Sequence, residues 1–148
     1  MTKAMAMTDL KQRPLPAPTG LTRPFWDAAR EGRLLVQKCN ACARLQFYPR
    51  PFCLACMSDD MGWRQSAGQG AVYTFTVNHR AAIEYLADQV PYVVAVVQLD
   101  EGPRLMGRVL NAKPGTVAIG ARVNVVFEST PEGIALPCFG LQAAQRRP

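Results

Sequence analysis

The chain has 148 residues, 49% of them hydrophobic, and a formal net charge of +6 at pH 7. This length suits one ordinary domain or two small ones, and the hydrophobic content excludes a chain that is disordered throughout. No apolar run approaches the roughly 20 residues that a membrane-spanning helix needs, so no membrane partner is expected. The positive charge favours anionic partners, without choosing among nucleic acid, a phosphorylated cofactor and an acidic protein surface.

The N-terminal 20 residues are predicted to form a flexible, proline-rich tail. Pro14, Pro16 and Pro18 occupy alternate positions, a pattern that favours extended backbone over helix. The short apolar run near the N-terminus is soon interrupted by Asp9 and Lys11, which argues against a secretory signal and predicts a cytoplasmic protein. In that compartment, paired cysteines are more often metal ligands than disulfides.

A short helix is predicted between Thr22 and Gly32. Thr22 can cap it, Pro24 can occupy its first turn, and Gly32 can end it. Phe25 and Trp26 lie on one side at helical spacing and are the predicted docking residues. An isolated helix of this length is marginal, so these rings either pack within the chain or enter a partner or ligand groove.

Four cysteines carry the strongest chemical signal in the chain. Cys39 and Cys42 form one CxxC pair, and after ten residues Cys53 and Cys56 form a second. Two such turns facing each other make the tetrahedral thiolate cage that Zn²⁺ favours. Because four thiolates fill the coordination shell, we expect one structural zinc per chain and no metal-based catalysis. Iron in the same cage, and disulfides or free thiols, are the alternatives that the spacing leaves open.

The ten residues between the two cysteine pairs are long enough for two short ribbon strands and a turn. After them, the Gly68-Gln69-Gly70 segment is predicted to be a flexible joint between the ribbon and a second module.

The rest of the chain alternates in the manner of short strands separated by glycine-rich turns. Five strands of this kind predict a small closed or half-closed barrel. Gly107 marks a possible bulge or bend, and residues 80–91 form an insertion that is partly helical. With one further strand ahead of the cysteines, the expected strands are residues 34–38, 71–77, 92–99, 104–110, 122–127 and 134–139.

A few residues outside the cysteine cluster are candidates for chemistry. Cys138 is predicted to be a buried structural thiol, and His79 to be a structural or surface histidine, because no catalytic motif surrounds either one. Arg80 can pair with a phosphate, and Arg104 and Arg108 share one strand face that is either solvated or a basic groove.

The order of these elements resembles a family of bacterial and archaeal proteins in which a rubredoxin-like zinc ribbon precedes an OB-fold. Members of that family are associated with acyl-CoA. The stretches that carry the resemblance are Pro24-Phe-Trp-Asp-Ala28, the two CxxC pairs, Tyr48-Pro-Arg50, Trp63, Gly68-Gln-Gly-Ala-Val-Tyr-Thr-Phe-Thr-Val77, Pro91 to Gly102, and Ile119 to Val123.

The resemblance implies a mainly β fold made of a short N-terminal helix, a four-cysteine zinc ribbon and a five-stranded OB-fold barrel. It also implies an accessory role beside thiolases of the sterol-carrier type, acyl-CoA hydratases or aldolases, or acetyltransferase and hydroxymethylglutaryl-CoA synthase assemblies. The predicted organisation is a tail over 1–20, a docking helix over 21–34, the ribbon over 35–66, the OB-fold over 67–141 and a C-terminal tail over 142–148.

The leading hypothesis is therefore a non-catalytic accessory subunit that binds a thiolase-type or hydratase-type enzyme and contributes to acyl-CoA binding. The candidate contacts to CoA phosphates are His79, Arg80, Arg104 and Arg108. The expected assembly is a homodimer or a hetero-oligomer, and a dimeric thiolase would make it two-plus-two.

Two other hypotheses stay open. One is a protein that binds single-stranded nucleic acid, with Tyr73, Phe75 and Tyr92 as stacking platforms. Dispersed basic residues weigh against it. The other is a free-standing enzyme that acts through Cys138 or His79.

Overall fold

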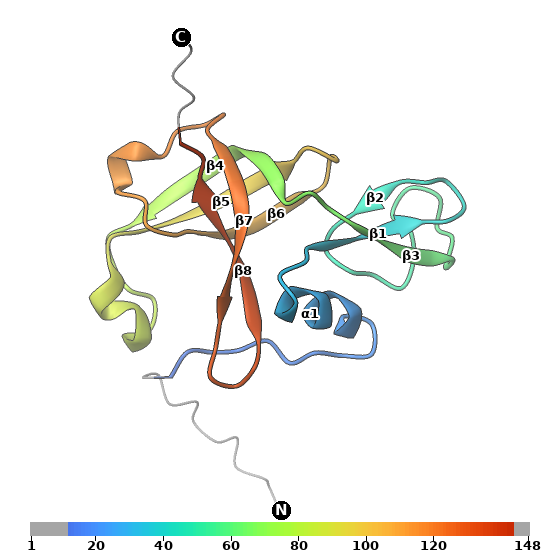
Figure 1. Cartoon of the computed structure of the whole chain (residues 1–148), viewed down its shortest axis with the longest axis horizontal. Coiled ribbons are helices and arrows are strands. Elements are labelled where there is room, and N and C mark those ends of the chain that lie inside the picture. The colour runs from blue at the N-terminus through green and yellow to red at the C-terminus, as the bar shows by residue number, and fades with distance from the viewer. Residues whose placement is uncertain (1–11, 144–148) are drawn as a thin grey trace, which may run out of the picture.

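The computed structural model describes residues 12–143 and contains two β modules, with a short helix packed beside both (Figure 1). Among these residues, no helix is both long and apolar enough to cross a membrane. The elements are α1 (Arg23–Arg30), β1 (Leu35–Cys39), β2 (Leu45–Gln46), β3 (Met61–Gln65), β4 (Gln69–Asn78), η1 (Glu84–Gln89), β5 (Tyr92–Leu99), β6 (Arg104–Val109), η2 (Pro114–Thr116), β7 (Arg122–Ser129) and β8 (Ala135–Leu141).

Helix α1 begins and ends close to the predicted limits. Pro24 lies in its first turn, and Gly32 follows its end with φ of 76° while its N–H donates to the carbonyl of Ala29 at 3.0 Å. Thr22 stands at the N-cap position as predicted, but the predicted capping bond was wrong, because its side chain accepts from no helical N–H. Its hydroxyl instead accepts a hydrogen bond from the backbone N–H of Thr19 at 2.9 Å, outside the helix.

The aromatic side of α1 faces the interior of the protein. Phe25 is 2% exposed and Trp26 is 9% exposed. The two rings meet edge to face at 4.9 Å, and Phe25 lies 5.4 Å from Phe47 of the ribbon. Helix α1 also contacts β7 and β8 of the barrel. Both rings therefore pack within the chain, and docking on a partner stays a prediction.

The ribbon is a three-stranded antiparallel sheet with the order β2-β1-β3. Between the cysteine pairs it has only the two-residue strand β2, so the prediction of two strands there was wrong. The loop that replaces the second strand is held by the buried side chains of Gln37 and Gln46, which take over the hydrogen bonds that a strand partner would make.

The second module is a closed barrel with the order β4-β5-β6-β8-β7. All five predicted strands are present, with ends shifted by at most two residues. Inward-facing side chains such as Val72, Val97, Val123 and Phe139 are buried and form its core. Helix η1 confirms the partly helical insertion.

The barrel wall is weakest where β6 meets β8. These parallel strands share one residue pair, Val109 with Phe139. The predicted bulge at Gly107 was wrong, because Gly107 pairs regularly with Ala95 and the register shift lies in β4 instead. Strand β8 crosses close to β6 at Gly107, where a Cβ atom would come within 3.1 Å of the Pro137 carbonyl oxygen. A residue without a side chain suits this position.

The joint between ribbon and barrel is clamped, which corrects the prediction of a flexible segment. The carboxylate of Glu101, in the turn between β5 and β6, accepts hydrogen bonds from the Ser66 hydroxyl at 3.0 Å and the Ala67 N–H at 2.7 Å. Gly68 has φ of 70°, and a Cβ atom there would lie 2.3 Å from a methyl group of Val125. Glycine is required here for close packing as well as for its backbone conformation.

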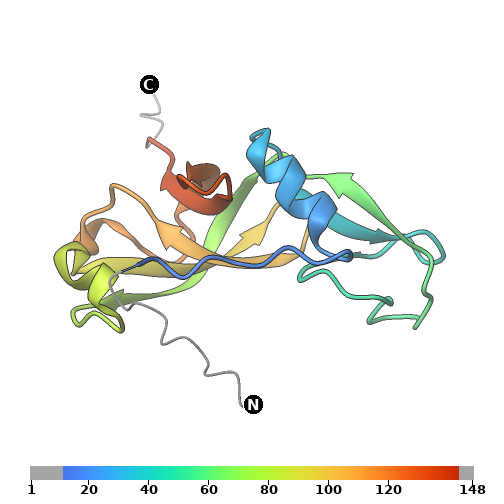
Figure 2. The same ribbon diagram turned by 90° about the horizontal axis from the view of Figure 1, so that it is seen from below.

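Residues 12–20, the described part of the predicted N-terminal tail, run along one side of the molecule from η1 toward α1 (Figure 2). Arg13 forms an ion pair with Glu128 of β7 at 2.6 Å, and its guanidinium lies 5.7 Å from the ring centre of Tyr85. The rest of that tail, and residues 144–148 of the predicted C-terminal tail, lie outside the described residues.

Candidate functional site

The four cysteine sulfurs converge on one point at the end of the ribbon. All four lie within 4.8 Å of one another, with Cys39 to Cys56 at 3.6 Å and Cys42 to Cys53 at 3.7 Å. A tetrahedral site with Zn–S bonds of about 2.3 Å has S···S edges of about 3.8 Å, so the donor set fits a four-thiolate metal. A disulfide, with an S–S bond of about 2.05 Å, does not fit these separations.

The two CxxC turns share the same hydrogen-bond pattern. In each, the residue after the second cysteine donates its N–H to the carbonyl of the first cysteine at 2.9 Å, from Ala43 to Cys39 and from Met57 to Cys53. Ala43 and Met57 both have left-handed backbone, with φ of 62° and 65°. The repeat in the sequence is therefore a repeat in structure, which places the second pair of sulfurs opposite the first.

Backbone donors favour the thiolate form of one of the four cysteines, Cys53. The N–H groups of Cys56 and Ala55 point at the sulfur of Cys53 and lower its pKa to about 6. Cys39 and Cys53 are fully buried, while Cys42 and Cys56 are exposed at the end of the ribbon. Four thiolates complete the shell, so such a metal holds the ribbon together and has no open position for substrate.

Sequence reasoning missed two residues that support this centre, Gln37 and Gln46. Their buried side chains bond to each other at 3.0 Å. Gln37 also binds the backbone of Arg50, and Gln46 binds the carbonyl of Phe52 and the N–H of Leu54. These bonds fix the loop that carries the second cysteine pair. Nothing in a single sequence distinguishes such glutamines from exposed strand residues.

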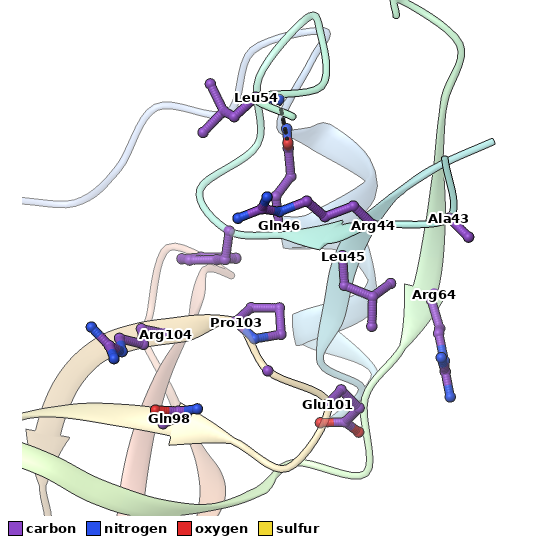
Figure 3. A pocket seen from close by; sticks show the side chains of 12 residues that line it. Ala43, Arg44, Leu45, Gln46, Leu54, Arg64, Gln98, Glu101, Pro103 and Arg104 are labelled. Atoms are coloured by element: carbon purple, nitrogen blue, oxygen red, sulfur yellow. Dashed lines mark hydrogen bonds between the residues drawn. The ribbon is translucent and has the colours of Figure 1, made fainter. Parts of the chain in front are cut away.

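A cleft of about 620 Å³ lies between the ribbon and the turn that joins β5 to β6, and is called the ribbon–barrel cleft here (Figure 3). Leu45 and Pro103 face each other across it, with Glu101 at its base. Its polar side chains include Arg44, Gln98 and Arg104. The predicted contact residue Arg104 thus lies at the end of the barrel nearest the ribbon, with its guanidinium 3.6 Å from the ring centre of Tyr73.

A second cavity, of about 450 Å³, has mostly apolar walls and is called the apolar pocket here. Its walls come from α1, the ribbon loop at residues 47–48, β6 and β8, so it covers the weakly paired seam of the barrel. Trp26 and Leu105 are among its apolar residues, and Arg13 and Arg108 lie among its lining residues.

Polar groups beside the apolar pocket are linked to one another. Glu128 binds Arg13, and the Cys138 thiol lies 3.7 Å from a Glu128 oxygen. Burial, followed by the negative charge of Glu128, raises the pKa of Cys138 to about 11. Cys138 is therefore a neutral, buried thiol at physiological pH and a poor nucleophile, as a structural cysteine should be.

The remaining predicted phosphate contacts lie apart from Arg104. Arg108 is four residues further along β6, about 13 Å at strand spacing, and Arg108 Nη1 donates to Gln89 at 2.7 Å. His79 and Arg80 are exposed just after β4, whose last residue pairs with Tyr92 at the start of β5. The structure therefore groups Arg108 with the η1 side of the barrel and leaves Arg104 at the ribbon side.

Two family models match consecutive parts of the chain. The model described as the ChsH2 rubredoxin-like zinc ribbon domain matches residues 26–62, and the model described as the ChsH2 C-terminal OB-fold domain matches residues 63–128. The chain belongs to this ChsH2-type, or DUF35, family. Its four-cysteine centre is accordingly that of a zinc ribbon, and its barrel is an OB-fold.

Relatives differ in length and in the names that they carry. A DUF35 domain-containing scaffold protein of Methanocaldococcus jannaschii is 33% identical over 109 residues, covering 72% of this chain and 77% of that protein. A probable enoyl-CoA hydratase alpha subunit of Thermomonospora curvata is 39% identical over 129 residues, covering 86% of this chain. This chain spans only 39% of that hydratase subunit.

A solved structure named Ltp2-ChsH2(DUF35) aldolase aligns with a TM-score of 0.77 and 33% identity, covering 86% of this chain and 98% of the chain that it matches. A DUF35 protein from Sulfolobus solfataricus aligns with a TM-score of 0.60 and 15% identity, which shows a shared fold only.

Proposed function

We propose that this chain is a non-catalytic accessory subunit that binds a thiolase-type or hydratase-type enzyme acting on acyl-CoA. The observation that carries the proposal is the match of ribbon and barrel together to 98% of the chain in the Ltp2-ChsH2(DUF35) aldolase. The name of that structure joins a DUF35 component to Ltp2 in an aldolase, and the archaeal relative of similar length is named a scaffold.

The chemistry of this chain supports an accessory role. A four-thiolate centre has no open coordination position. Cys138 is buried with a raised pKa, and His79 makes no hydrogen bond or ion pair within the described part of the chain. A cysteine nucleophile is activated by a lowered pKa, whereas the pKa of Cys138 is raised.

Contact with acyl-CoA is the finer part of the proposal. Arg108, His79 and Arg80 lie toward the same end of the barrel and suit contact with acyl-CoA better as a group than with Arg104. Arg104 serves a separate contact at the ribbon–barrel cleft. Structural zinc, one ion per chain, holds the ribbon that borders this cleft.

Binding of single-stranded nucleic acid is an outcome that the same experiment tests. Phe75 packs against the barrel core, and one face of Tyr73 is covered by Arg104. Phe75 is therefore partly buried, and Tyr73, which is 48% exposed, has one face left for stacking, which favours the accessory role.

The decisive experiment is co-purification. The full chain, tagged and produced in its native host, should recover a thiolase-type or acyl-CoA hydratase-type enzyme in stoichiometric amount. Purified alone, it should leave acyl thioesters intact. Turnover by the lone chain that is lost on His79→Ala or Cys138→Ala would overturn the proposal. So would salt-sensitive binding to a single-stranded oligonucleotide without recovery of such an enzyme.

A further inference from the structure

The apolar pocket is built by three separate parts of the chain. Trp26 comes from α1, Tyr48 from the ribbon loop, and Leu105 and Leu136 from the two strands at the seam of the barrel. Its volume of about 450 Å³ is in the range of pockets that hold small molecules. The wall beneath the pocket is the seam between β6 and β8, which share a single residue pair and therefore no continuous hydrogen-bond ladder.

The charge beside this pocket is not balanced. Its lining arginines, Arg13 and Arg108, carry two positive charges, and within residues 12–143 Glu128 supplies the one carboxylate to which either of them bonds. Cys138 adds no charge, because its thiol is neutral. The Glu128 carboxylate bonds to Arg13, while Arg108 bonds to the neutral amide of Gln89. One positive charge therefore remains next to an apolar cavity.

Arg108 also has an unused donor. Its Nε is buried and has no hydrogen-bond partner in the described structure. A buried donor that lacks an acceptor costs about 1–3 kcal/mol, so such groups are rare unless something else supplies the acceptor. Because this atom is closed off from the cavity, the Arg108 side chain has to turn toward the apolar pocket, which it lines, before an oxygen on a bound molecule can accept from its Nε.

We propose that the apolar pocket binds an acyl chain whose oxygen-bearing head group meets Arg108. The apolar walls contact the acyl chain. The Arg108 guanidinium, which bonds to no carboxylate among the described residues, binds a carboxylate or the carbonyl oxygen of a thioester. A free fatty carboxylate and an acyl thioester both offer an apolar chain ending in an oxygen acceptor, so either one could be the ligand. The thioester source rests on the proposed function, whereas the carboxylate source does not.

The test is calorimetric titration of the full, zinc-loaded chain with decanoate, decanoyl-CoA, decanol and CoA. We expect saturable binding of decanoate, of decanoyl-CoA or of both, and at least tenfold weaker binding of decanol. Binding of decanoate without decanoyl-CoA identifies the ligand as a free carboxylate. Binding of decanoyl-CoA without decanoate identifies it as a thioester. If CoA binds as tightly as decanoyl-CoA, the assignment is overturned, because the decanoyl group would then contribute nothing to the affinity. Absence of saturable binding for all four probes would also overturn it.

Two pairs of variants locate the site. Arg108→Met removes the head-group contact and Met106→Trp fills the pocket from an exposed position, so each should weaken binding at least tenfold. Arg64→Met and Ile119→Trp are the matched controls, because both residues are exposed and neither lines the apolar pocket; they should bind within twofold of the parent. Equal losses in variants and controls would place the ligand elsewhere.

Trp26 offers a second readout that does not depend on these variants. In a Trp63→Phe background it is the remaining tryptophan, and it lines the apolar pocket. Each decyl probe that binds in the calorimeter should shift its emission with the same midpoint. A chain that recruits its enzyme but ignores every decyl probe would refute the pocket assignment and leave the proposed function standing. A protein that binds decanoate but recruits no enzyme would support the pocket assignment and refute the proposed function.

Discussion

The ribbon and the barrel are held together by different forces. In the barrel, side chains from all five strands bury one another, as in the cluster around Val97 and Phe139. In the ribbon, the fully buried residues include two cysteines and a glutamine, Cys39, Cys53 and Gln37. Burial of apolar surface stabilises the barrel at roughly 25 cal/mol per Å². The ribbon adds few fully buried apolar side chains of its own, chiefly Val36, and depends on its metal as well.

This difference fits the separate tasks of the two modules. A metal-held ribbon can present exposed apolar side chains, such as Leu54 and Met57, without weakening its own core. The barrel needs its apolar core, and its strand pairing is shortest at one place, between β6 and β8. Helix α1 packs on both modules, against β1 of the ribbon and against β7 and β8 of the barrel.

The largest expected effect comes from removing the metal. Cys53→Ser should abolish zinc binding and unfold residues 35–66, since binding to such sites supplies about 10–16 kcal/mol of folding free energy. Amide hydrogen exchange should show strands β4 to β8 still protected. Cys138→Ala also removes one cysteine and should keep one zinc per chain. Equal loss of protection in barrel and ribbon would show that they fold as one unit.

A core truncation in the barrel should give the opposite pattern. Phe139→Ala empties a fully buried site and should cost about 3–5 kcal/mol of unfolding free energy. The ribbon should keep its metal, so zinc release followed with a dye should come at a higher temperature than loss of barrel circular dichroism. Phe52→Ala, at an exposed ribbon position, is the control. A single shared midpoint would contradict the separation of forces.

A smaller effect is expected from the glutamines that support the metal centre. Gln46→Leu leaves the Phe52 carbonyl and the Leu54 N–H without their partner and should weaken zinc binding by about 10–100-fold. Competition with a chelator measures this change. Gln65→Leu, at an exposed position in β3, should leave the affinity unchanged. If both variants behave alike, the buried amides do not orient the second cysteine pair.

The sequence predicts those features that local patterns carry. Two CxxC turns are local, so the metal centre follows from their spacing. Alternation of side chains is also local, so the five barrel strands could be placed within two residues. Strand β3 escapes this reasoning, because Met61–Gln65 has little alternation and becomes a strand by pairing with β1.

Features made by residues far apart in the sequence could not be predicted. Arg13 and Glu128 are separated by 115 positions, and the apolar pocket collects side chains from α1, the ribbon and the barrel. The aromatic pattern of Phe25 and Trp26 indicated that they must be covered, but only the structure shows what covers them. The clamp at Glu101 likewise depends on how two modules meet.

The smallest predicted effect concerns the ion pair that ties the N-terminal segment to the barrel. A hydrogen bond from Arg13, assisted by its charge, lowers the pKa of Glu128 below its ordinary value of 4.5. The folded protein therefore keeps this carboxylate ionised at a pH where the unfolded chain has protonated it. The stabilisation is present above about pH 4.5 and is lost as the pH falls through the lower folded pKa.

Because both side chains are partly exposed, Glu128→Gln should cost about 1 kcal/mol or less at neutral pH, and the difference from the parent should shrink toward zero in acid. Hydrogen exchange at residues 12–16 is the suitable measurement, since acid also protonates the thiolates and releases the metal, which would dominate a global melt. Asp27→Asn, in an exposed pair on α1, should leave those amides unchanged. A difference that grows in acid would show that the pair with Arg13 does not hold the segment, and that the carboxylate is tolerated there only when protonated.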